Sequence, residues 1–151
     1  MSDETARMPI VEFFIPGIPK PGGSKRFFGM SKAGRAIIAD DCKNADWKNS
    51  CKAFALQAYK LPHVSWAIAV TCTFHMPRPK YHFKADGSLS PKFANAMPTK
   101  KPDATKLFRS TEDALTGILW VDDALIVQQH IAKRYTYDGR PGAMIRVEVA
   151  R

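Results

Sequence analysis

The sequence predicts an α/β (α+β) domain in which a mixed or antiparallel sheet of about four strands accompanies two main helices. Three observations carry this prediction. Strict period-two alternation of apolar residues over 64–75 indicates a strand with one buried face. Apolar residues at three- and four-residue steps indicate helices over 41–59 and 103–117. Turn residues separate the remaining short apolar runs, which are typical of further strands.

The chain is predicted to open with a strand over 11–15, because Pro16 and Gly17 close this apolar run. No Asp or Glu occurs over 13–39, although Lys25, Arg26 and three other cations do. This composition indicates a basic loop or hairpin. We expect Lys25 and Arg26 to contact nucleic-acid phosphates, and a merely solvated hairpin is the alternative.

A long basic loop is predicted over about 76–102, inside a single domain that spans 1–151. It holds five prolines and a single acid, Asp86. Aromatic side chains lie between its cations, a mixture typical of surfaces that neutralise phosphates and stack on bases. A plain mobile loop is the alternative. The residues expected to bind nucleic acid here are Arg78, Lys80, Lys84, Phe93, Lys100 and Lys101, with Lys106 just beyond the loop.

The second helix, over 103–117, has an apolar stripe that includes Leu107, Ala114 and Leu115, and Gly117 provides its stop. Two further strands are expected over 125–134 and 143–149. The residues 138–142 between them form a strong turn signal of aspartate, glycine and proline.

The charge balance favours a polyanionic partner. There are 23 Lys and Arg residues against 14 Asp and Glu residues, which gives a formal net charge of +9. The three cysteines and four histidines show no zinc-binding spacing, so zinc hydrolase chemistry is disfavoured. The chain has no signal-peptide pattern and no membrane-spanning apolar run, so we expect a cytoplasmic protein that does not associate with membranes.

Acidic residues are conspicuous at two places in this basic sequence, Asp103 after the long loop and Asp122 with Asp123 after the second helix. Hydrolysis of a phosphodiester needs a strong oxygen nucleophile, and Mg²⁺ held by carboxylates provides one. The alternatives are ordinary structural roles. Asp103 is placed to cap a helix, and Asp122 with Asp123 is placed in an exposed turn.

The blocks around these acids resemble the RusA family of Holliday-junction resolvases. Its signature runs K-P-D-x-D-N-L-x-K, then D-A-L-(N/T)-G, then D-D. The matching blocks in this chain are residues 101–109, 113–117 and 120–124. The opening 14–19 and the residues 75–77 also resemble members of the family, so the similarity touches most of the chain.

The resemblance implies a RusA-like fold and a Mg²⁺-dependent endodeoxyribonuclease, with Mn²⁺ able to substitute. It implies a homodimer that resolves branched DNA, the four-way junction, and it suggests a phage or prophage source. Asp103 and Asp123 match the family's first and last catalytic aspartates, and Asp122 is the adjacent acid. We therefore expect Asp103, Asp122 and Asp123 to bind the metal, and Asp103 and Asp123 to converge on it.

The sequence departs from the signature where the family has its second Asp, its Asn and its Lys. Thr105, Lys106 and Arg109 stand there instead. Thr105 can hold a metal-bound water through its hydroxyl, or Glu112 or Asp122 can supply the missing oxygen. Arg109 cannot exchange protons near neutral pH, so an electrostatic role is expected; an ion pair with the residue four positions later is the alternative.

Two other functions remain open from the sequence. One is a catalytically impaired RusA-like protein that only binds branched DNA, for which Thr105 is the main support. The other is a basic RNA-associated protein that uses its aromatic loops as stacking platforms.

Overall fold

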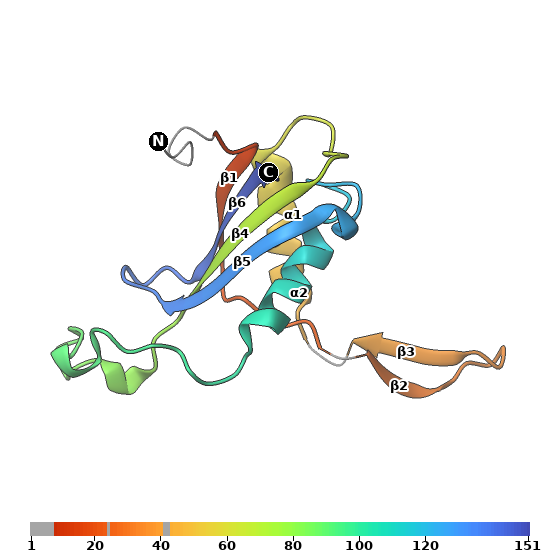
Figure 1. Cartoon of the computed structure of the whole chain (residues 1–151). Helices are drawn as coiled ribbons and strands as arrows, with labels where there is room; N and C mark the ends of the chain where they lie inside the picture. The colour runs from red at the N-terminus through yellow and green to blue at the C-terminus, as the bar shows by residue number, and fades with distance from the viewer. Residues whose placement is uncertain (1–7, 24, 41–42) are drawn as a thin grey trace.

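The computed structural model describes residues 8–23, 25–40 and 43–151 (Figure 1). The strands of its main sheet are β1 (Val11–Pro16), β4 (Ile68–Met76), β5 (Ile126–Tyr135) and β6 (Gly142–Val149), in the order β1-β6-β4-β5. The two helices are α1 (Ala45–Ala58) and α2 (Ala104–Leu115). The predicted α+β class, with a four-stranded sheet and two main helices, is confirmed.

The sheet is mixed, because β6 runs antiparallel to both β1 and β4 whereas β4 and β5 are parallel. Two parallel neighbours need a long crossover connection. In this chain the long loop and α2 form this connection. They lead from β4 to β5, which is an edge strand of the sheet.

The period-two alternation of β4 sets the core. Ile68, Val70, Cys72 and Phe74 are buried on the face of the sheet that the helices cover. Trp66 continues the same alternation in the sequence, but it precedes the strand and is 50% exposed. The strand therefore begins later than the pattern predicts.

Helix α2 is held against α1 by a buried hydrogen bond. The indole Nε1 of Trp47 donates to Thr111 Oγ1 at 3.0 Å, and the Thr111 hydroxyl itself donates to the Leu107 carbonyl at 2.9 Å. Leu107 and Leu115 are fully buried in the same core. These contacts fix which face of α2 is turned toward solvent.

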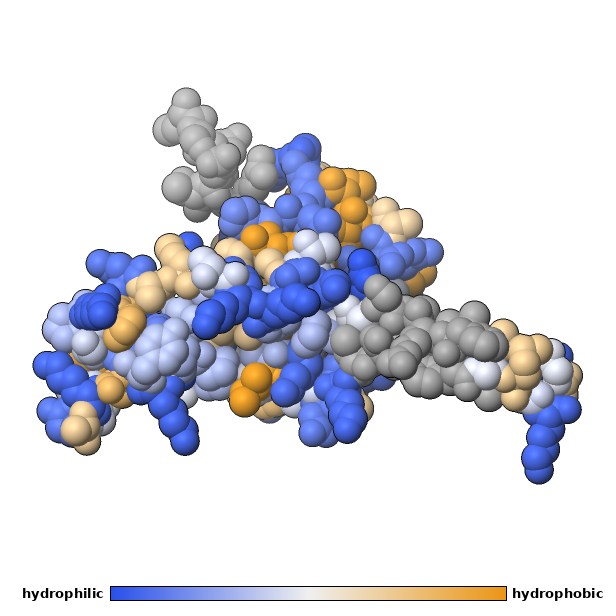
Figure 2. Space-filling view, turned by 90° about the horizontal axis from the view of Figure 1, so that it is seen from below, coloured by the Kyte–Doolittle hydropathy of each residue, from blue (hydrophilic) through white to orange (hydrophobic). Residues whose placement is uncertain are grey.

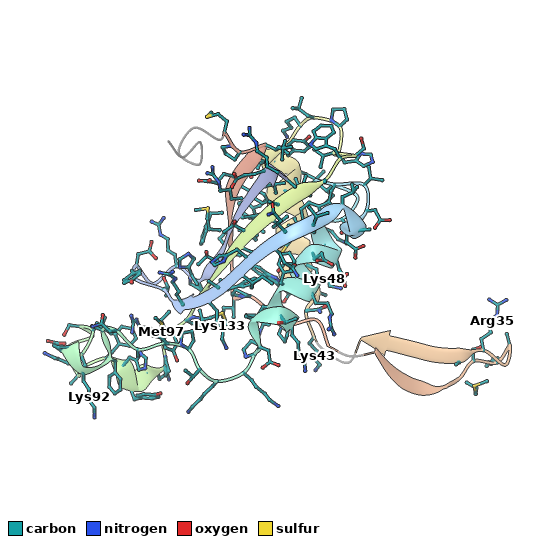
Figure 3. All side chains as sticks on the ribbon, in the orientation of Figure 1. Arg35, Lys43, Lys48, Lys92, Met97 and Lys133 are labelled. Atoms are coloured by element: carbon teal, nitrogen blue, oxygen red, sulfur yellow. The ribbon has the colours of Figure 1, made fainter. Side chains whose placement is uncertain are left out.

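Two short strands, β2 (Lys25–Met30) and β3 (Ala36–Asp40), pair antiparallel as a hairpin that projects from the main body (Figure 1). The segment predicted as a basic loop or hairpin is thus a hairpin, and its contact with nucleic acid stays a prediction. Arg35 lies at the tip of the hairpin (Figure 3). The side chains of Lys25 and Arg26 fall outside the described part of the structure.

Residues 77–97 form an ordered lobe, which we call the loop lobe, rather than a structureless loop. Arg78 organises it, donating from Nη1 to the Phe93 carbonyl at 2.9 Å and from Nε to the Thr136 carbonyl at 3.2 Å. The buried His82 stacks on Phe93, with ring centroids 4.5 Å apart and planes 4° apart. A segment rich in proline can therefore be ordered when a guanidinium donates hydrogen bonds to its backbone carbonyls.

The loop lobe is expected to lose stability as the pH falls below neutral. Burial lowers the pKa of His82, and the nearby Arg78 guanidinium lowers it further. The folded lobe therefore binds fewer protons than the unfolded chain once the pH falls below the ordinary histidine pKa, so its stability declines in that range. Hydrogen exchange of lobe amides, corrected for intrinsic rates, should show easier opening at pH 5 than at pH 7. His63→Gln, at an exposed histidine, should preserve the difference, whereas equal opening at both pH values would refute the prediction.

Cys51 and Cys72 are buried free thiols. Burial raises the pKa of the Cys51 thiol to about 12, so this thiol stays protonated. Cys42 lies outside the described residues. Among the described helices, none has the length and apolar character that a membrane span requires.

Candidate active site

The exposed face of α2 carries three polar residues that are candidates for the active site. Thr105, Arg109 and Glu112 are spaced by four and then three positions, so they lie along one side of the helix. Thr105 and Arg109 are exposed, and Glu112 is half-buried. We call this row the α2 face.

Three carboxyl groups meet at the C-terminal end of the α2 face. The Asp123 carboxyl hydrogen-bonds to that of Glu112 and also to that of Asp122. Burial, together with the Asp123 carboxylate, raises the pKa of Glu112 to about 7. The Glu112 carboxyl therefore exchanges its proton close to neutral pH.

Asp122 and Asp123 reach this position because the chain turns tightly after α2. The carboxylate of Asp122 accepts a hydrogen bond from the Ala124 N–H at 2.8 Å, at the start of a short 3₁₀ turn over Asp123–Leu125. This bond, with the contact to Asp123, lowers the pKa of Asp122. The exposed turn that the sequence offered as an alternative role for Asp122 and Asp123 is present. The same turn places both acids beside α2.

This group of acids offers the oxygen ligands that a hard divalent cation prefers. Within the residues that the structure describes, no three Asp, Glu, His or Cys side chains are arranged to enclose a metal ion. Mg²⁺ in proteins commonly uses one or two carboxylates and retains several waters. The donor set around Asp123 fits that pattern of binding.

Asp103 lies at the other end of α2, where it is the N-cap residue. Its carboxylate is exposed and makes no capping hydrogen bond. The alternative role of this side chain, to cap the helix, is therefore not observed. Glu112 follows about nine residues later, and a helix rise of about 1.5 Å per residue separates the two by about 13 Å along the axis. Most of the helix therefore lies between Asp103 and the acids beside Glu112, and the convergence of Asp103 and Asp123 on one cation stays a prediction.

Arg109 is directed along the α2 face rather than into an ion pair with Asp113. Asp113 instead meets Lys48 of α1, with Nζ and Oδ2 3.8 Å apart. The Arg109 charge acts on Glu112, where it opposes the upward shift of the pKa. The Arg109 side chain also packs beside Gly22, where an added Cβ would lie 3.3 Å from its Cγ.

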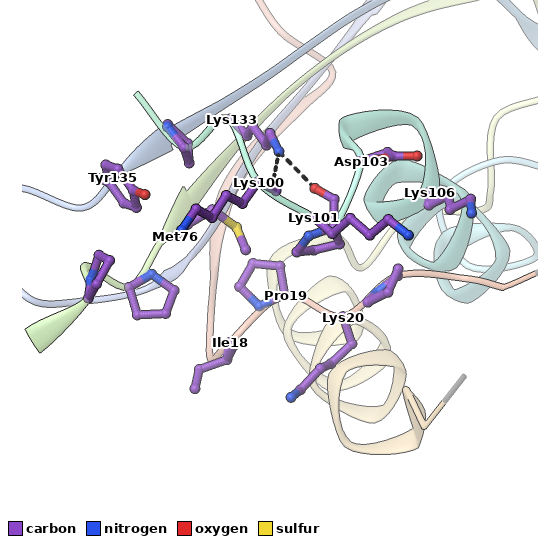
Figure 4. A pocket seen from close by; sticks show the side chains of 15 residues that line it. Ile18, Pro19, Lys20, Met76, Lys100, Lys101, Asp103, Lys106, Lys133 and Tyr135 are labelled. Atoms are coloured by element: carbon purple, nitrogen blue, oxygen red, sulfur yellow. Dashed lines mark hydrogen bonds between the residues drawn. The ribbon is translucent and has the colours of Figure 1, made fainter. Parts of the chain in front are cut away.

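A pocket of about 680 Å³ opens beside Asp103 at the N-terminal end of α2 (Figure 4). Asp103, Lys101 and Lys106 lie on the same side of it, and Lys100 also lines it. Three of the cations predicted to bind nucleic acid are therefore gathered around a single opening. A view from below shows mostly hydrophilic side chains on this side of the molecule (Figure 2).

The loop lobe distributes its predicted nucleic-acid contacts unevenly. Lys80 and Lys84 are exposed. Arg78 donates to the carbonyl of Phe93 inside the lobe and to that of Thr136 outside it, and His82 covers one face of Phe93; both residues thus have structural roles, and their contacts with DNA stay a prediction. Charge and aromatic content alone could not reveal this, because neither shows which groups satisfy one another.

Sequence reasoning left the place of Glu112 open and missed the pocket altogether. The signal for Glu112 was its spacing from Thr105 and Arg109, which puts all three on one side of a helix. The pocket has no local signal. Its walls come from four separate segments, and only the fold brings them together.

Comparison with known proteins agrees with this geometry. A family model described as "Endodeoxyribonuclease RusA" matches residues 16–148. The chain is also 24% identical over 140 residues to the uncharacterized protein YqaN of Bacillus subtilis (strain 168), an alignment that covers 92% of this chain and 97% of the relative. The family match includes β4, β5, both helices and the whole α2 face. This chain therefore belongs to the RusA endodeoxyribonuclease family, which implies a nuclease of the Holliday-junction resolvase type.

Proposed function

We propose that this protein is a Mg²⁺-dependent, structure-specific DNA endonuclease that resolves four-way junctions by paired phosphodiester hydrolysis, leaving 5′-phosphate and 3′-hydroxyl ends. The observation that carries the proposal is the meeting of Asp122, Asp123 and Glu112 on an exposed helix face of a strongly basic protein. A positive surface attracts DNA, and carboxylates in its midst attract a cation.

Asp123 and Asp122 are the proposed metal ligands, with Glu112 beside them and Asp103 at the N-terminal end of α2. When bound, Mg²⁺, or Mn²⁺ in its place, supplies an activated water at neutral pH and offsets the charge that develops on the phosphate. Thr105 is the N-terminal residue of the α2 face and is exposed to solvent.

Arg109 stabilises negative charge on the phosphate in this proposal. Its guanidinium remains charged at every relevant pH, and its planar fork suits two phosphate oxygens at once. It already faces Glu112 along the α2 face. Lys106, Lys101 and Lys100 then hold neighbouring phosphates at the N-terminal end of the helix.

A homodimer is part of the proposal, because a two-fold axis presents two equivalent sites to two equivalent strands of a junction. Paired nicks placed in this way can be religated. Light scattering of the purified protein, alone and with a junction, measures the stoichiometry.

Incubation of the wild-type protein with a synthetic four-way junction tests the function. Cleavage products are expected in Mg²⁺ or Mn²⁺ and not in EDTA, with little cutting of a linear duplex of the same sequence. Mobility-shift assays in EDTA with the junction, the duplex and a structured RNA measure binding separately. Tighter binding of RNA than of the junction at equal salt would argue against the proposal.

A second candidate, a protein that binds junctions without cutting them, is favoured by one observation. Thr105 stands where the family signature has an aspartate, so the α2 face has one carboxylate fewer. This candidate predicts a mobility shift with no product in either metal. The substitution described next separates it from a merely slow enzyme.

Thr105→Asp is expected to increase junction cleavage by about tenfold or more, as changes around a metal site commonly alter activity by 10–100-fold. The added carboxylate lies in the first turn of α2, where negative charge also stabilises the helix. Single-turnover rates at saturating protein provide the measurement. Thr105→Asn is the matched control, because it has the same shape without the charge. Equal rates for the two variants would show that position 105 contributes no metal-directed charge.

A further inference from the structure

The pocket beside Asp103 is built from prolines. Its walls come from the connection after β1, the end of β4, the residues that precede α2, and β5. We call it the proline pocket, after the six prolines that line it: Pro19, Pro21, Pro77, Pro79, Pro98 and Pro102. At about 680 Å³ it is within the size range of small-molecule sites, which is roughly 300–1,000 Å³.

The wall of the proline pocket suits a flat apolar group. Met76, Ile18 and the ring of Tyr135 add apolar surface to the proline rings (Figure 4). Proline has no backbone N–H, so these residues provide few hydrogen-bond donors with which to distinguish one base edge from another. A ring system that enters is held by contact and stacking, with little selection for its identity.

The rim of the pocket suits an anion. Five lysines line it, against the single acid Asp103: Lys20, Lys100, Lys101, Lys106 and Lys133. Lys133 has a structural task, since its Nζ donates to the carbonyls of Lys100 and Pro102 at 2.8 Å each and so fixes the segment before α2 (Figure 4). At the rim, Asp103 is the single acid that offsets the positive charge of the other four lysines. An apolar floor under a cationic rim matches a nucleotide, whose base is flat and whose phosphate is charged.

The pocket also has a defined place relative to the proposed cleavage site. It lies at the N-terminal end of α2, where Asp103 and Lys106 line it, and the Glu112–Asp123 carboxyls lie toward the other end, about 13 Å from Asp103 along the helix axis. At about 3.4 Å per nucleotide along a B-form strand, this distance corresponds to about four nucleotides. A strand that follows α2 therefore passes both places.

We propose that the proline pocket receives one unstacked DNA base from the strand that is cut. This inference rests on the proposed function, because it takes branched DNA as the substrate. Moving a base out of a continuous duplex costs a few kcal/mol, and the cost is least where stacking or pairing is already interrupted. The exchange point of a junction is such a place. Occupation of the pocket selects branched over linear DNA without reading sequence.

Photocrosslinking of a four-way junction tests the proposal. 5-Bromodeoxyuridine is placed in turn at each of about four positions on either side of the exchange point, the span that the length of α2 suggests. The complex with the wild-type protein is formed in EDTA, which prevents cleavage, and is irradiated. Mass spectrometry of the crosslinked peptides should place the adduct on Met76 or Tyr135 for one or two probe positions.

A variant that fills the pocket provides the second measurement. Ile18 lines the pocket and is 50% exposed, so Ile18→Trp adds bulk at the opening without disturbing the core. The yield of the pocket crosslink, compared at equal junction occupancy, should fall by about tenfold, as expected when one stacked base is lost. Leu61→Trp is the matched control, because Leu61 is 69% exposed and lines a different pocket.

The outcomes separate the two proposals. If the wild type binds and cleaves junctions but crosslinks only outside the pocket, or if Ile18→Trp leaves the yield unchanged, the base pocket is refuted and the proposed function stands. If the wild type neither binds nor cleaves junctions, the proposed function fails and the base pocket fails with it.

Discussion

Asp123→Asn is expected to reduce the rate of junction cleavage by about 10³-fold, which corresponds to about 4 kcal/mol of transition-state stabilisation. The substitution keeps the shape of the side chain and removes the charge at the centre of the Glu112–Asp122–Asp123 group. Binding of the junction in EDTA should stay within about twofold, because affinity for DNA comes mainly from the cations. Single-turnover cleavage and mobility shifts measure the two effects separately.

The control is Asp46→Asn, which removes a charge from an exposed acid in the first turn of α1. Its cleavage rate should match that of the wild type. Cleavage at an unaltered rate by Asp123→Asn would contradict the assignment of the metal site.

Asp103→Asn extends the same experiment to the N-terminal end of α2. Since about 13 Å of helix axis separates Asp103 from Glu112, we propose that the two aspartates act on different parts of the substrate within one chain. Asp123→Asn should raise the Mg²⁺ concentration that gives half-maximal cleavage, whereas Asp103→Asn should lower the rate with little change in that concentration. A similar rise for both variants would mean that assembly on DNA brings the two residues to one cation.

Gly142→Ala is expected to destabilise the fold by about 3 kcal/mol, at the upper end of the usual cost of overpacking. Gly142 lies in β6, paired with Pro16 of β1 and His75 of β4. A Cβ at this position would overlap the carbonyl oxygen of Ile15 and the ring of Phe14. Relief requires the backbone of β1 to move, which opposes its pairing with β6.

Thermal unfolding should show this loss as a fall in Tm of about 6–12 °C for a domain of this size. The matched control is Met144→Ala, two positions further along β6 at a side chain that is 39% exposed; its Tm should change by much less. A Tm for Gly142→Ala equal to that of the wild type would show that β1 tolerates the displacement.

The elements of the fold were predictable wherever one side of an element is buried. The alternation along β4 and the apolar stripe of α2 each reflect burial of a single face, and both elements are found close to their predicted positions. Trp66 shows the limit of this reasoning, because a pattern of residue types continues past the point where backbone pairing starts. The order of the strands was not predictable, since it depends on contacts between distant segments.

The site was predictable as a set of residues and not as an arrangement. Its family signature points to Asp103 and Asp123, but only the structure shows that α2 runs unbroken between the places where they lie. Arg78 illustrates the same limit for binding residues. Its charge suggested phosphate, whereas its three bonded carbonyls, those of Phe93, Ala94 and Thr136, belong to the protein.

The loop lobe leaves the sheet at the end of β4, and its base is fastened to the chain that follows β5. Met76 and Tyr135 are register partners, and the Thr136 N–H donates to the Met76 carbonyl at 2.9 Å. Arg78 binds the Thr136 carbonyl in turn. Beyond Pro77 and Pro79, which line the proline pocket, a change in the length of the lobe would leave the spacing of residues along α2 as it is.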